Sequence, residues 1–344
     1  MIKMKRMKHI FRSLSLLPVF AAVLAVSCSK SSVTDTNAAL KRQFDAWREI
    51  HYPDAMEKDG IYIIEEKQGD GLDWDKNLPV TFLTYTVRAL DGTVTDNTDE
   101  QWAKQLGVWD QTYYYGQQVF LTGKDVSYAG IDALLDGMKI GGSRTAIVPT
   151  WMCTTERYDK VEEYLEHEVD NSIASAIYTV TLLGQAVNLA EYEFNNLRRY
   201  SILNWQVADT LSTAAVFFKS FTKFDSEPEE MPSDTTVYVN YIGRRVSDGQ
   251  VFDTNIADTA KFYHIYDPTR TYTPTSYKWA ETVDDMVKND NIISGFAHGL
   301  HRMHAGEKAS FAFGYNLGYG SSAKGNLIPR YAALRFDVEL VPEP

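Results

Sequence analysis

The chain has 344 residues, of which 34 are Lys or Arg and 46 are Asp or Glu, so its formal net charge at pH 7 is −12. An acidic surface repels nucleic acid and anionic lipid headgroups, which excludes electrostatic binding to either as a function. This length is typical of two domains.

The first 27 residues are typical of an export signal and not of a folded core. An apolar run from Leu14 to Val26, shorter than a membrane span, follows a basic segment without acidic residues. The run ends at Ser27-Cys28, and small residues before a cysteine are typical of a bacterial lipoprotein cleavage site. Cys28 would then become the acylated first residue. A conventional signal peptide cleaved near Ser27 and an uncleaved anchor are the alternatives.

Acylation at Cys28 would leave Cys153 as the only other cysteine, so the mature chain could form no internal disulfide. We therefore expect Cys153 to be a small buried side chain. Loss of residues 1–27 removes five positive charges and lowers the net charge from −12 to −17. The predicted location is outside the cytoplasm, lipid-anchored to a bacterial membrane, with the periplasmic face of the outer membrane favoured.

Two predicted helices each precede strand-like sequence. Residues 28–57 are predicted to be a polar tether and a helix, because Leu40, Phe44 and Trp47 recur at helical spacing. Residues 187–212 are predicted to be a helical linker. This recurrence indicates an internal duplication of the chain.

The duplication is visible as an alignment without gaps of residues 80–96 with residues 237–253. Both segments alternate apolar and polar residues around an Asp-Gly dipeptide, which predicts a β-hairpin in each copy. Residues 130–141 align likewise with residues 295–306, and each predicts a short helix that ends at a glycine.

Both copies end in an alternating strand, at residues 178–182 and 336–340. The predicted fold class is therefore α+β, with an antiparallel sheet wrapped on one short helix in each copy. The two domains are predicted at residues 58–186 and 213–344.

Six blocks of the second copy occur in a characteristic order and spacing. They are residues 237–243, 248–253, 292–300, 306–309, 318–322, and 327–329 with 334–340. These blocks resemble the FKBP family of peptidyl-prolyl cis–trans isomerases. The resemblance implies two tandem FKBP-like domains, of which the first is degenerate.

The resemblance also implies an aromatic pocket between the sheet and the short helix. It assigns catalytic roles to Tyr319, Asp253, Phe296 and Ile293. It assigns the substrate-binding wall to Tyr241, Phe252, Phe262, Ile292, Ile328 and Phe336. Phe296 stands where the family usually has a tryptophan. For Phe252 and Phe336, a role in core packing alone is the alternative.

Such a pocket suits isomerisation of X–Pro bonds, which needs no nucleophile, metal or cofactor. The barrier to rotation is about 18–20 kcal/mol because resonance stiffens the amide. A catalyst has only to bind the twisted amide better than the planar one. The resemblance implies that the Tyr319 hydroxyl and the Ile293 backbone N–H donate to substrate carbonyls, while Asp253 and Tyr241 orient one another. The expected partners are proline-containing exported polypeptides.

The stretch from His264 to Asn291 is longer than the compact family pattern. It is predicted to be an inserted loop beside the pocket, which either contacts substrate or serves packing.

The first copy is predicted to have lost the site. The ungapped alignment places Thr84 opposite Tyr241, Thr95 opposite Phe252, Tyr128 opposite Ile293 and Ile131 opposite Phe296. An acidic, helical segment at residues 158–168 replaces the loop that carries Tyr319. Binding, spacing, dimerisation and stability remain open as roles for this domain.

No metal site is predicted. His298, His301 and His304 advance by three along one helix, so they spread around it and do not converge on one point. The function predicted first is a peptidyl-prolyl isomerase. The alternative is a non-catalytic peptide-binding, assembly or chaperone lipoprotein that uses the same groove.

Overall fold

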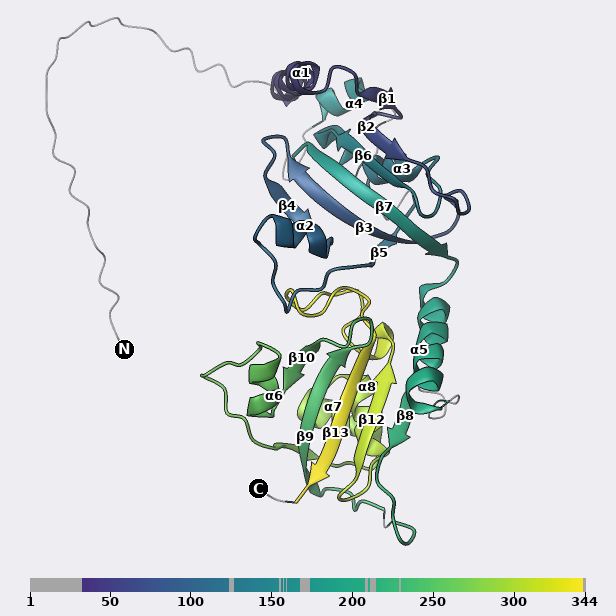
Figure 1. Ribbon diagram of the computed structural model, residues 1–344, viewed down its shortest axis with the longest axis vertical. Helices are drawn as coiled ribbons and strands as arrows, with labels where there is room; N and C mark the ends of the chain where they lie inside the picture. The colour runs from purple at the N-terminus through teal and green to yellow at the C-terminus, as the bar shows by residue number, and fades with distance from the viewer. Residues whose placement is uncertain are drawn as a thin grey trace, which may run out of the picture.

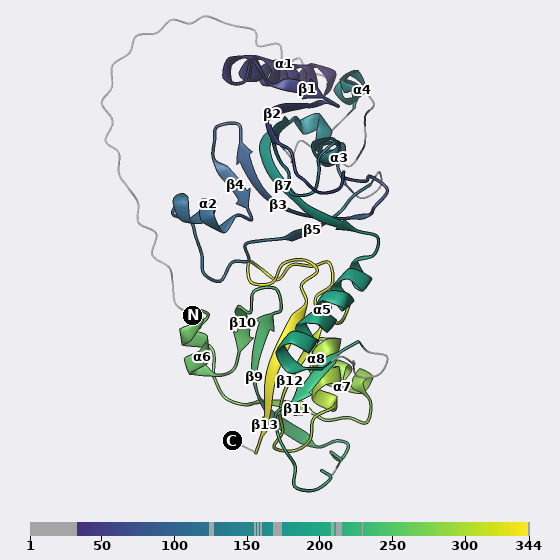
Figure 2. The same cartoon turned by 45° about the vertical axis from the view of Figure 1, so that its right-hand side comes forward.

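The computed structural model describes residues 33–342 except 124–126, 155, 157, 159, 168–173, 208, 209, 211–214 and 229. The predicted acylation site, Cys28, therefore lies outside the described residues. The described chain forms two sheet-containing domains stacked along the long axis (Figures 1 and 2). Helix α5 (Leu189–Trp205) leads from the first domain into the second and lies along the side of the second.

The first domain is built on one antiparallel sheet with the strand order β1-β2-β6-β7-β3-β4, in which β5 also pairs with β3. Its strands are β1 (Met56–Lys58), β2 (Ile61–Lys67), β3 (Val80–Ala89), β4 (Val94–Asn97), β5 (Gln118–Leu121), β6 (Ser143–Val148) and β7 (Ala176–Ala186). Its helices are α1 (Val33–His51), α2 (Glu100–Gln105), α3 (Ala129–Leu135), the 3-10 turn η1 (Thr150–Met152) and α4 (Val161–Glu166).

The second domain has an antiparallel sheet with the strand order β10-β9-β13-β12-β8, in which β11 also pairs with β9. Its strands are β8 (Phe217–Ser220), β9 (Thr236–Arg245), β10 (Val251–Thr254), β11 (Thr275–Lys278), β12 (Lys308–Phe313) and β13 (Leu334–Val341). Its helices are α6 (Ala257–Phe262), α7 (Val283–Asp290), α8 (Ser294–His301) and the 3-10 turn η3 (Tyr315–Leu317).

The two sheets have the same connectivity. The run β2-β6-β7-β3-β4 in the first domain corresponds strand by strand to β8-β12-β13-β9-β10 in the second. The strands β5 and β11 pair in the same way with β3 and β9, and the short helices α3 and α8 occupy the same place in chain order. The predicted α+β fold class, with two tandem domains, is therefore confirmed.

Both predicted Asp-Gly turns join the expected strands. Gly92 has φ +91° and Gly249 has φ +73°, a left-handed conformation that glycine adopts without strain. In each turn the aspartate before the glycine accepts a hydrogen bond from the backbone N–H two residues on, namely Thr93 N to Asp91 Oδ1 and Gln250 N to Asp248 Oδ1. The turn chemistry read from the sequence thus determines both hairpins.

Helix α8 packs directly on its sheet because two of its residues have no side chain. A Cβ at Gly295 would lie 2.3 Å from the Phe313 ring, and one at Gly299 would lie 2.3 Å from the Phe311 ring. In the first domain a Cβ at Gly130, the counterpart of Gly295, would lie 2.4 Å from Val148. Close approach of one helix to the sheet is thus common to both domains.

The predicted amino-terminal helix is α1, and it covers one end of the first sheet. Its Phe44 is buried against Trp151, with ring centroids 5.1 Å apart. The predicted acidic helical segment contains α4, whose Tyr164 is fully buried in the same cluster. Cys153 is buried as expected, and burial raises the pKa of its thiol to about 12.

The stretch 264–291 is more ordered than the predicted inserted loop. It contains β11, which extends the sheet along β9, and α7, which packs against α8. Met286 of α7 is fully buried, and Trp279 stacks on His301 with ring centroids 5.3 Å apart. Most of this segment therefore serves packing.

Helix α5 holds the two domains together. Asn188 begins it by accepting hydrogen bonds from two backbone N–H groups, and Gln206, with φ +59°, ends it. Leu189 packs with the first domain, while Leu197 and Trp205 pack against Phe217 of the second. The predicted linker thus contains a helix that packs against both domains.

A buried arginine adds a polar link between the domains. The Arg245 side chain is 1% exposed, pairs with Asp248 at 2.7 Å and donates from Nη1 to the Thr112 carbonyl at 3.0 Å. Because Thr112 belongs to the first domain, this hydrogen bond fixes the two domains at that point. The backbone N–H of Tyr114 also donates to the Asn326 carbonyl, at 3.3 Å.

Glu193 on α5 gives the fold a pH dependence. Its Oε2 accepts the Tyr315 backbone N–H at 3.2 Å, and burial raises the pKa of its carboxyl from 4.5 to about 7. The unfolded chain loses this proton first, so the free energy of unfolding falls as pH rises from about 4.5 to 7. We predict that Glu193→Gln removes this decline and stabilises the chain at pH 8 by roughly 1–3 kcal/mol. Urea unfolding at pH 5 and pH 8 measures the effect, with the exposed Glu191→Gln as control.

Candidate functional site

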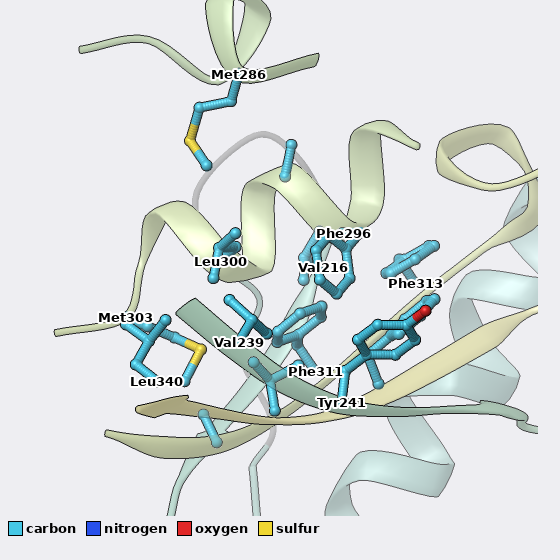
Figure 3. Packing of buried hydrophobic residues seen from close by; sticks show 14 of the residues in the cluster. Val216, Val239, Tyr241, Met286, Phe296, Leu300, Met303, Phe311, Phe313 and Leu340 are labelled. Atoms are coloured by element: carbon cyan, nitrogen blue, oxygen red, sulfur yellow. The ribbon is translucent and has the colours of Figure 1, made fainter. Parts of the chain in front are cut away.

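The second domain contains a cluster of aromatic rings between its sheet and α8. Phe336 of β13 lies at its centre, with ring centroids 4.9 Å from Phe296 and 5.7 Å from Phe252, both edge-to-face. The ring centroid of Tyr241 in β9 lies 6.3 Å from that of Phe336. Figure 3 shows Phe296 and Leu300 projecting from the helix towards the strands that carry Phe311 and Tyr241. The predicted aromatic wall is thus brought together by one helix and three strands.

A glycine in β9 makes room for two of these rings. A Cβ at Gly243 would lie 2.7 Å from Cζ of Phe252 and 3.0 Å from Cε1 of Phe336. Gly243 also pairs with Phe336 across the β9–β13 ladder. Both rings therefore lie against bare backbone at this position.

Tyr241, Asp253 and Arg270 form a polar network at the edge of the cluster. The Tyr241 hydroxyl donates to Asp253 Oδ2 at 2.7 Å and accepts from Arg270 Nη2 at 2.9 Å. Arg270 Nη1 forms an ion pair with Asp253 Oδ1. Burial, and then the charge of Asp253, raise the pKa of Tyr241, so its hydroxyl stays protonated. Its hydrogen-bonding capacity is used within the network.

Two donors beside the cluster have no partner among the residues that the structure describes. The Tyr319 hydroxyl makes no hydrogen bond there, although its ring packs against the cluster. The pKa of Tyr319 is raised by burial and then by the charge of Asp253, which keeps the hydroxyl a donor. The backbone N–H of Ile293, the residue that precedes α8, is likewise unpaired.

The remaining predicted residues divide into two groups. Ile328 is 4% exposed and belongs to the cluster, and Ile292 packs against it. Phe262 does not: it is 74% exposed and contacts Tyr263. The predicted wall is wrong at Phe262, because its position at the end of α6 leaves its ring in solvent.

Sequence reasoning missed Arg270 and several rings. Arg270 belongs to the segment 264–291, which is longer than the family pattern, so no spacing pointed to it. The ring centroid of Tyr277 in β11 lies 5.4 Å from that of Phe296. Phe311 and Phe313 of β12 are fully buried under α8, and their alternation in an apolar strand was the available signal.

The first domain retains part of this arrangement, which corrects the ungapped alignment. Tyr85, and not Thr84, is the counterpart of Tyr241, because Tyr85 pairs with Val180 as Tyr241 pairs with Val338. The turn between β3 and β4 is one residue shorter than the turn between β9 and β10, which shifts the register.

The corrected register restores the polar pair. The Tyr85 hydroxyl donates to Asp96 Oδ2 at 2.8 Å, as Tyr241 does to Asp253. A cavity of about 200 Å³ also lies at the counterpart of the aromatic cluster, lined by residues that include Tyr85, Phe120 and Tyr178. The first domain therefore keeps a cavity at this place, and the predicted loss concerns the rings and the loop that carries Tyr319.

The three histidines that the sequence placed on one helix have separate neighbours, and His304 lies beyond the end of α8. His301 stacks on Trp279, and His304 Nδ1 lies 3.2 Å from Glu307 Oε2. Burial lowers the pKa of His298. Within the described ranges, no group of three or more His, Cys, Asp or Glu side chains could hold a metal ion.

The second domain is similar in sequence to known FKBP-type proteins. The sequence model of the FKBP-type peptidyl-prolyl cis-trans isomerase matches residues 227–341. FK506-binding protein 2 of Candida glabrata is 32% identical over 111 residues, which are 32% of this chain and 65% of that protein. The macrophage infectivity potentiator of Trypanosoma cruzi is 31% identical over 108 residues, 31% of this chain and 43% of that protein. The chain thus spans less than two thirds of the length of these relatives.

Solved structures with similarity to the chain include multidomain proteins. The three FKBP domains of wheat FKBP73 align over 82% of this chain and 94% of theirs, with 17% identity and a TM-score of 0.30. FkpA from Escherichia coli aligns over 44% of this chain and 58% of its own, with 25% identity and a TM-score of 0.31.

We predict that Gly243→Ala displaces the Phe252 and Phe336 rings, because its Cβ would overlap both. The free energy of unfolding should fall by about 1–3 kcal/mol, as in other overpacked cores. Thermal or urea unfolding measures this change. The control is Gly184→Ala in β7, whose Cβ would meet only Phe82 at an ordinary 3.7 Å. Equal stability of the two variants would contradict the packing described for Gly243.

Proposed function

The carboxy-terminal domain of this chain belongs to the FKBP-type peptidyl-prolyl cis–trans isomerase family, and we propose that it isomerises X–Pro bonds in exported polypeptides. The observation that carries this proposal is the pairing of an aromatic cluster with two free donors, the Tyr319 hydroxyl and the Ile293 N–H. Such a site can bind a twisted amide without covalent chemistry.

The aromatic rings favour the transition state over the planar amide. A planar amide is polar, because its nitrogen and carbonyl share charge, whereas a twisted amide has lost that conjugation. Phe252, Phe296 and Phe336 supply an apolar surface with little water, which costs the planar form more than the twisted one. The same rings can hold the proline ring in place.

The two free donors address the carbonyl oxygens that flank the rotating bond. Ile293 has φ −66° and ψ 142°, so it lies just outside the helix and its N–H is not used by α8. Tyr319 keeps its proton because burial and Asp253 raise the pKa of its hydroxyl. Donors that are fixed before the substrate binds need little reorganisation during rotation.

The network of Tyr241, Asp253 and Arg270 positions the edge of the site. Both Asp253 oxygens are occupied, one by the Tyr241 hydroxyl and one by the Arg270 guanidinium. Asp253 therefore acts as an acceptor that orients Tyr241 and holds the segment 264–291 against the sheet. We propose this positioning role for it in place of direct proton transfer.

The chain is proposed to act outside the cytoplasm, held to a membrane by lipid on Cys28. The support is the basic segment, the short apolar run and the small residues before Cys28. Cys153 is unsuited to modification because it is buried. No helix among the described residues is long and apolar enough to cross a bilayer.

We predict that Tyr319→Phe lowers kcat/KM for a proline-containing tetrapeptide by about 10-fold, because one hydrogen bond to the substrate is lost. Phe296→Ala should lower it at least as much by opening the cluster. A protease-coupled or NMR exchange assay on the chain measures both. Phe262→Ala is the control, since its exposed ring should leave the rate unchanged.

A fully active Tyr319→Phe, Phe296→Ala double variant would show that this site is not where isomerisation occurs. Absence of any rate above background in the unaltered chain, with peptide binding retained, would instead favour the non-catalytic peptide-binding reading.

We predict that Cys28→Ser abolishes acylation and releases the chain from the membrane fraction, because the thiol is the acceptor of the lipid. Metabolic labelling with a palmitate analogue and fractionation of the cells measure both effects. Cys153→Ser should leave labelling unchanged, and persistent labelling of Cys28→Ser would rule out the proposed anchor.

A further inference from the structure

A cavity of about 560 Å³ lies between the two domains, and both contribute to its lining. From the first domain come Tyr85, Asp96, Phe120 and Tyr128, among others. The apolar 200 Å³ cavity in the first domain shares these four residues, so the two spaces meet at them. Together they have the size of a typical site for a small molecule or a few residues of peptide.

The inner, apolar part of the cavity lies where the first domain lacks two aromatic rings of the second. Ile131 takes the place of Phe296, and Thr95 takes the place of Phe252. At Phe311, by contrast, the loss is compensated: its counterpart is Ala146, and Leu134 stands where α8 has Gly299. The core is therefore filled beneath α3. Val87, at the place of Gly243, fills part of the space of the lost Phe252 ring, and the cavity lies beside Ile131.

The rim keeps the polar groups of the second domain's site. Tyr85 and Asp96 form the same hydroxyl–carboxylate pair as Tyr241 and Asp253. Tyr128, just before α3, has φ −70° and ψ 149°, close to the values of Ile293. Its backbone N–H is also without a partner among the described residues, so it is a free donor at the mouth of the cavity.

The second domain completes this cavity. The first domain's own segment at the place of the Tyr319 loop includes α4, which packs against α1, away from the cavity. The loop before β13 lies at the domain junction instead (Figure 1) and contributes Asn326, Pro329 and Arg330 to the lining. Burial and the charge of Asp96 raise the pKa of Tyr85, and Arg330 is the cation that opposes them. Arg330 lines the cavity together with Tyr85 and Asp96, on the side of the second domain.

We propose that this interdomain cavity is a second polypeptide-binding site, which takes one large apolar side chain into the pocket between Ile131 and Phe120. The opened floor favours phenylalanine or leucine over the smaller proline ring. The Tyr128 N–H and the Arg330 side chain suit backbone carbonyls on either side of that residue. That the ligand is a polypeptide rests on the proposed function of the second domain, whose groove has the same fold position.

The unaltered chain provides the first test, with the proline-free peptide acetyl-Ala-Ala-Bpa-Ala-Ala-amide as probe, where Bpa is photoreactive p-benzoylphenylalanine. After irradiation and proteolysis, mass spectrometry should locate saturable cross-links in residues 118–135 and 323–331. The same peptide with phenylalanine at the centre should compete, and the one with alanine should not. Cross-links confined to the Phe296 and Tyr319 region, or none that saturate, would overturn the proposal.

Variants then separate the two sites. Ile131→Phe restores the ring that the second domain has at this position and should weaken probe binding at least tenfold. Arg330→Ala should weaken it less, and Phe296→Ala should not change it. Retained probe binding by a folded Ile131→Phe chain, checked by circular dichroism, contradicts the proposal.

The outcome is independent of the isomerase assay. Ile131→Phe should keep the wild-type isomerisation rate, because Ile131 belongs to the other domain. Loss of isomerase activity in the unaltered chain with intact cross-linking at residues 118–135 would reject the proposed function and keep this site. Full isomerase activity without such cross-links would support the proposed function and reject this second site.

Discussion

The seating of a short helix directly on each sheet is the constraint on which both domains depend. In the second domain Gly295 and Gly299 let α8 approach until their backbone touches the rings of Phe313 and Phe311. Any side chain at these glycines would lift the helix. The close approach places Phe296 over Phe336, and it leaves the Ile293 N–H at the mouth of the aromatic cluster.

The two domains use this common frame for different purposes. Beneath the helix, large and small residues are exchanged in compensation, so that Leu134 with Ala146 replaces Gly299 with Phe311 and the core stays filled. At the rim the exchange is only partial: Val87 takes the place of Gly243 and fills part of the space of the lost Phe252 ring, while Ile131 leaves the place of the Phe296 ring open. The second domain therefore has a wall of rings that Gly243 accommodates, whereas the first domain has an open cavity.

One loop serves both sites. The segment from Tyr319 to Tyr331 carries Tyr319 and Ile328 into the aromatic cluster of its own domain, and Pro329 and Arg330 into the cavity of the other. Helix α5 and the buried Arg245 hold the domains in the relative position that this requires. The two domains thus form one structural unit through these contacts.

Sequence patterns alone predicted the duplication, both hairpins and the helices α1, α3, α5 and α8, because periodicity and Asp-Gly turn chemistry act over a few residues. They did not predict β11 and α7 in the segment 264–291. The contact of Tyr85, and not Thr84, with Asp96 became visible in the three-dimensional structure, because a turn shorter by one residue moves every side chain of the strand to the other face. The tertiary structure also placed Arg270 on Asp253 and left Phe262 in solvent. Contacts between residues far apart in the chain leave no local pattern, and the cavity between the domains is made of such contacts alone.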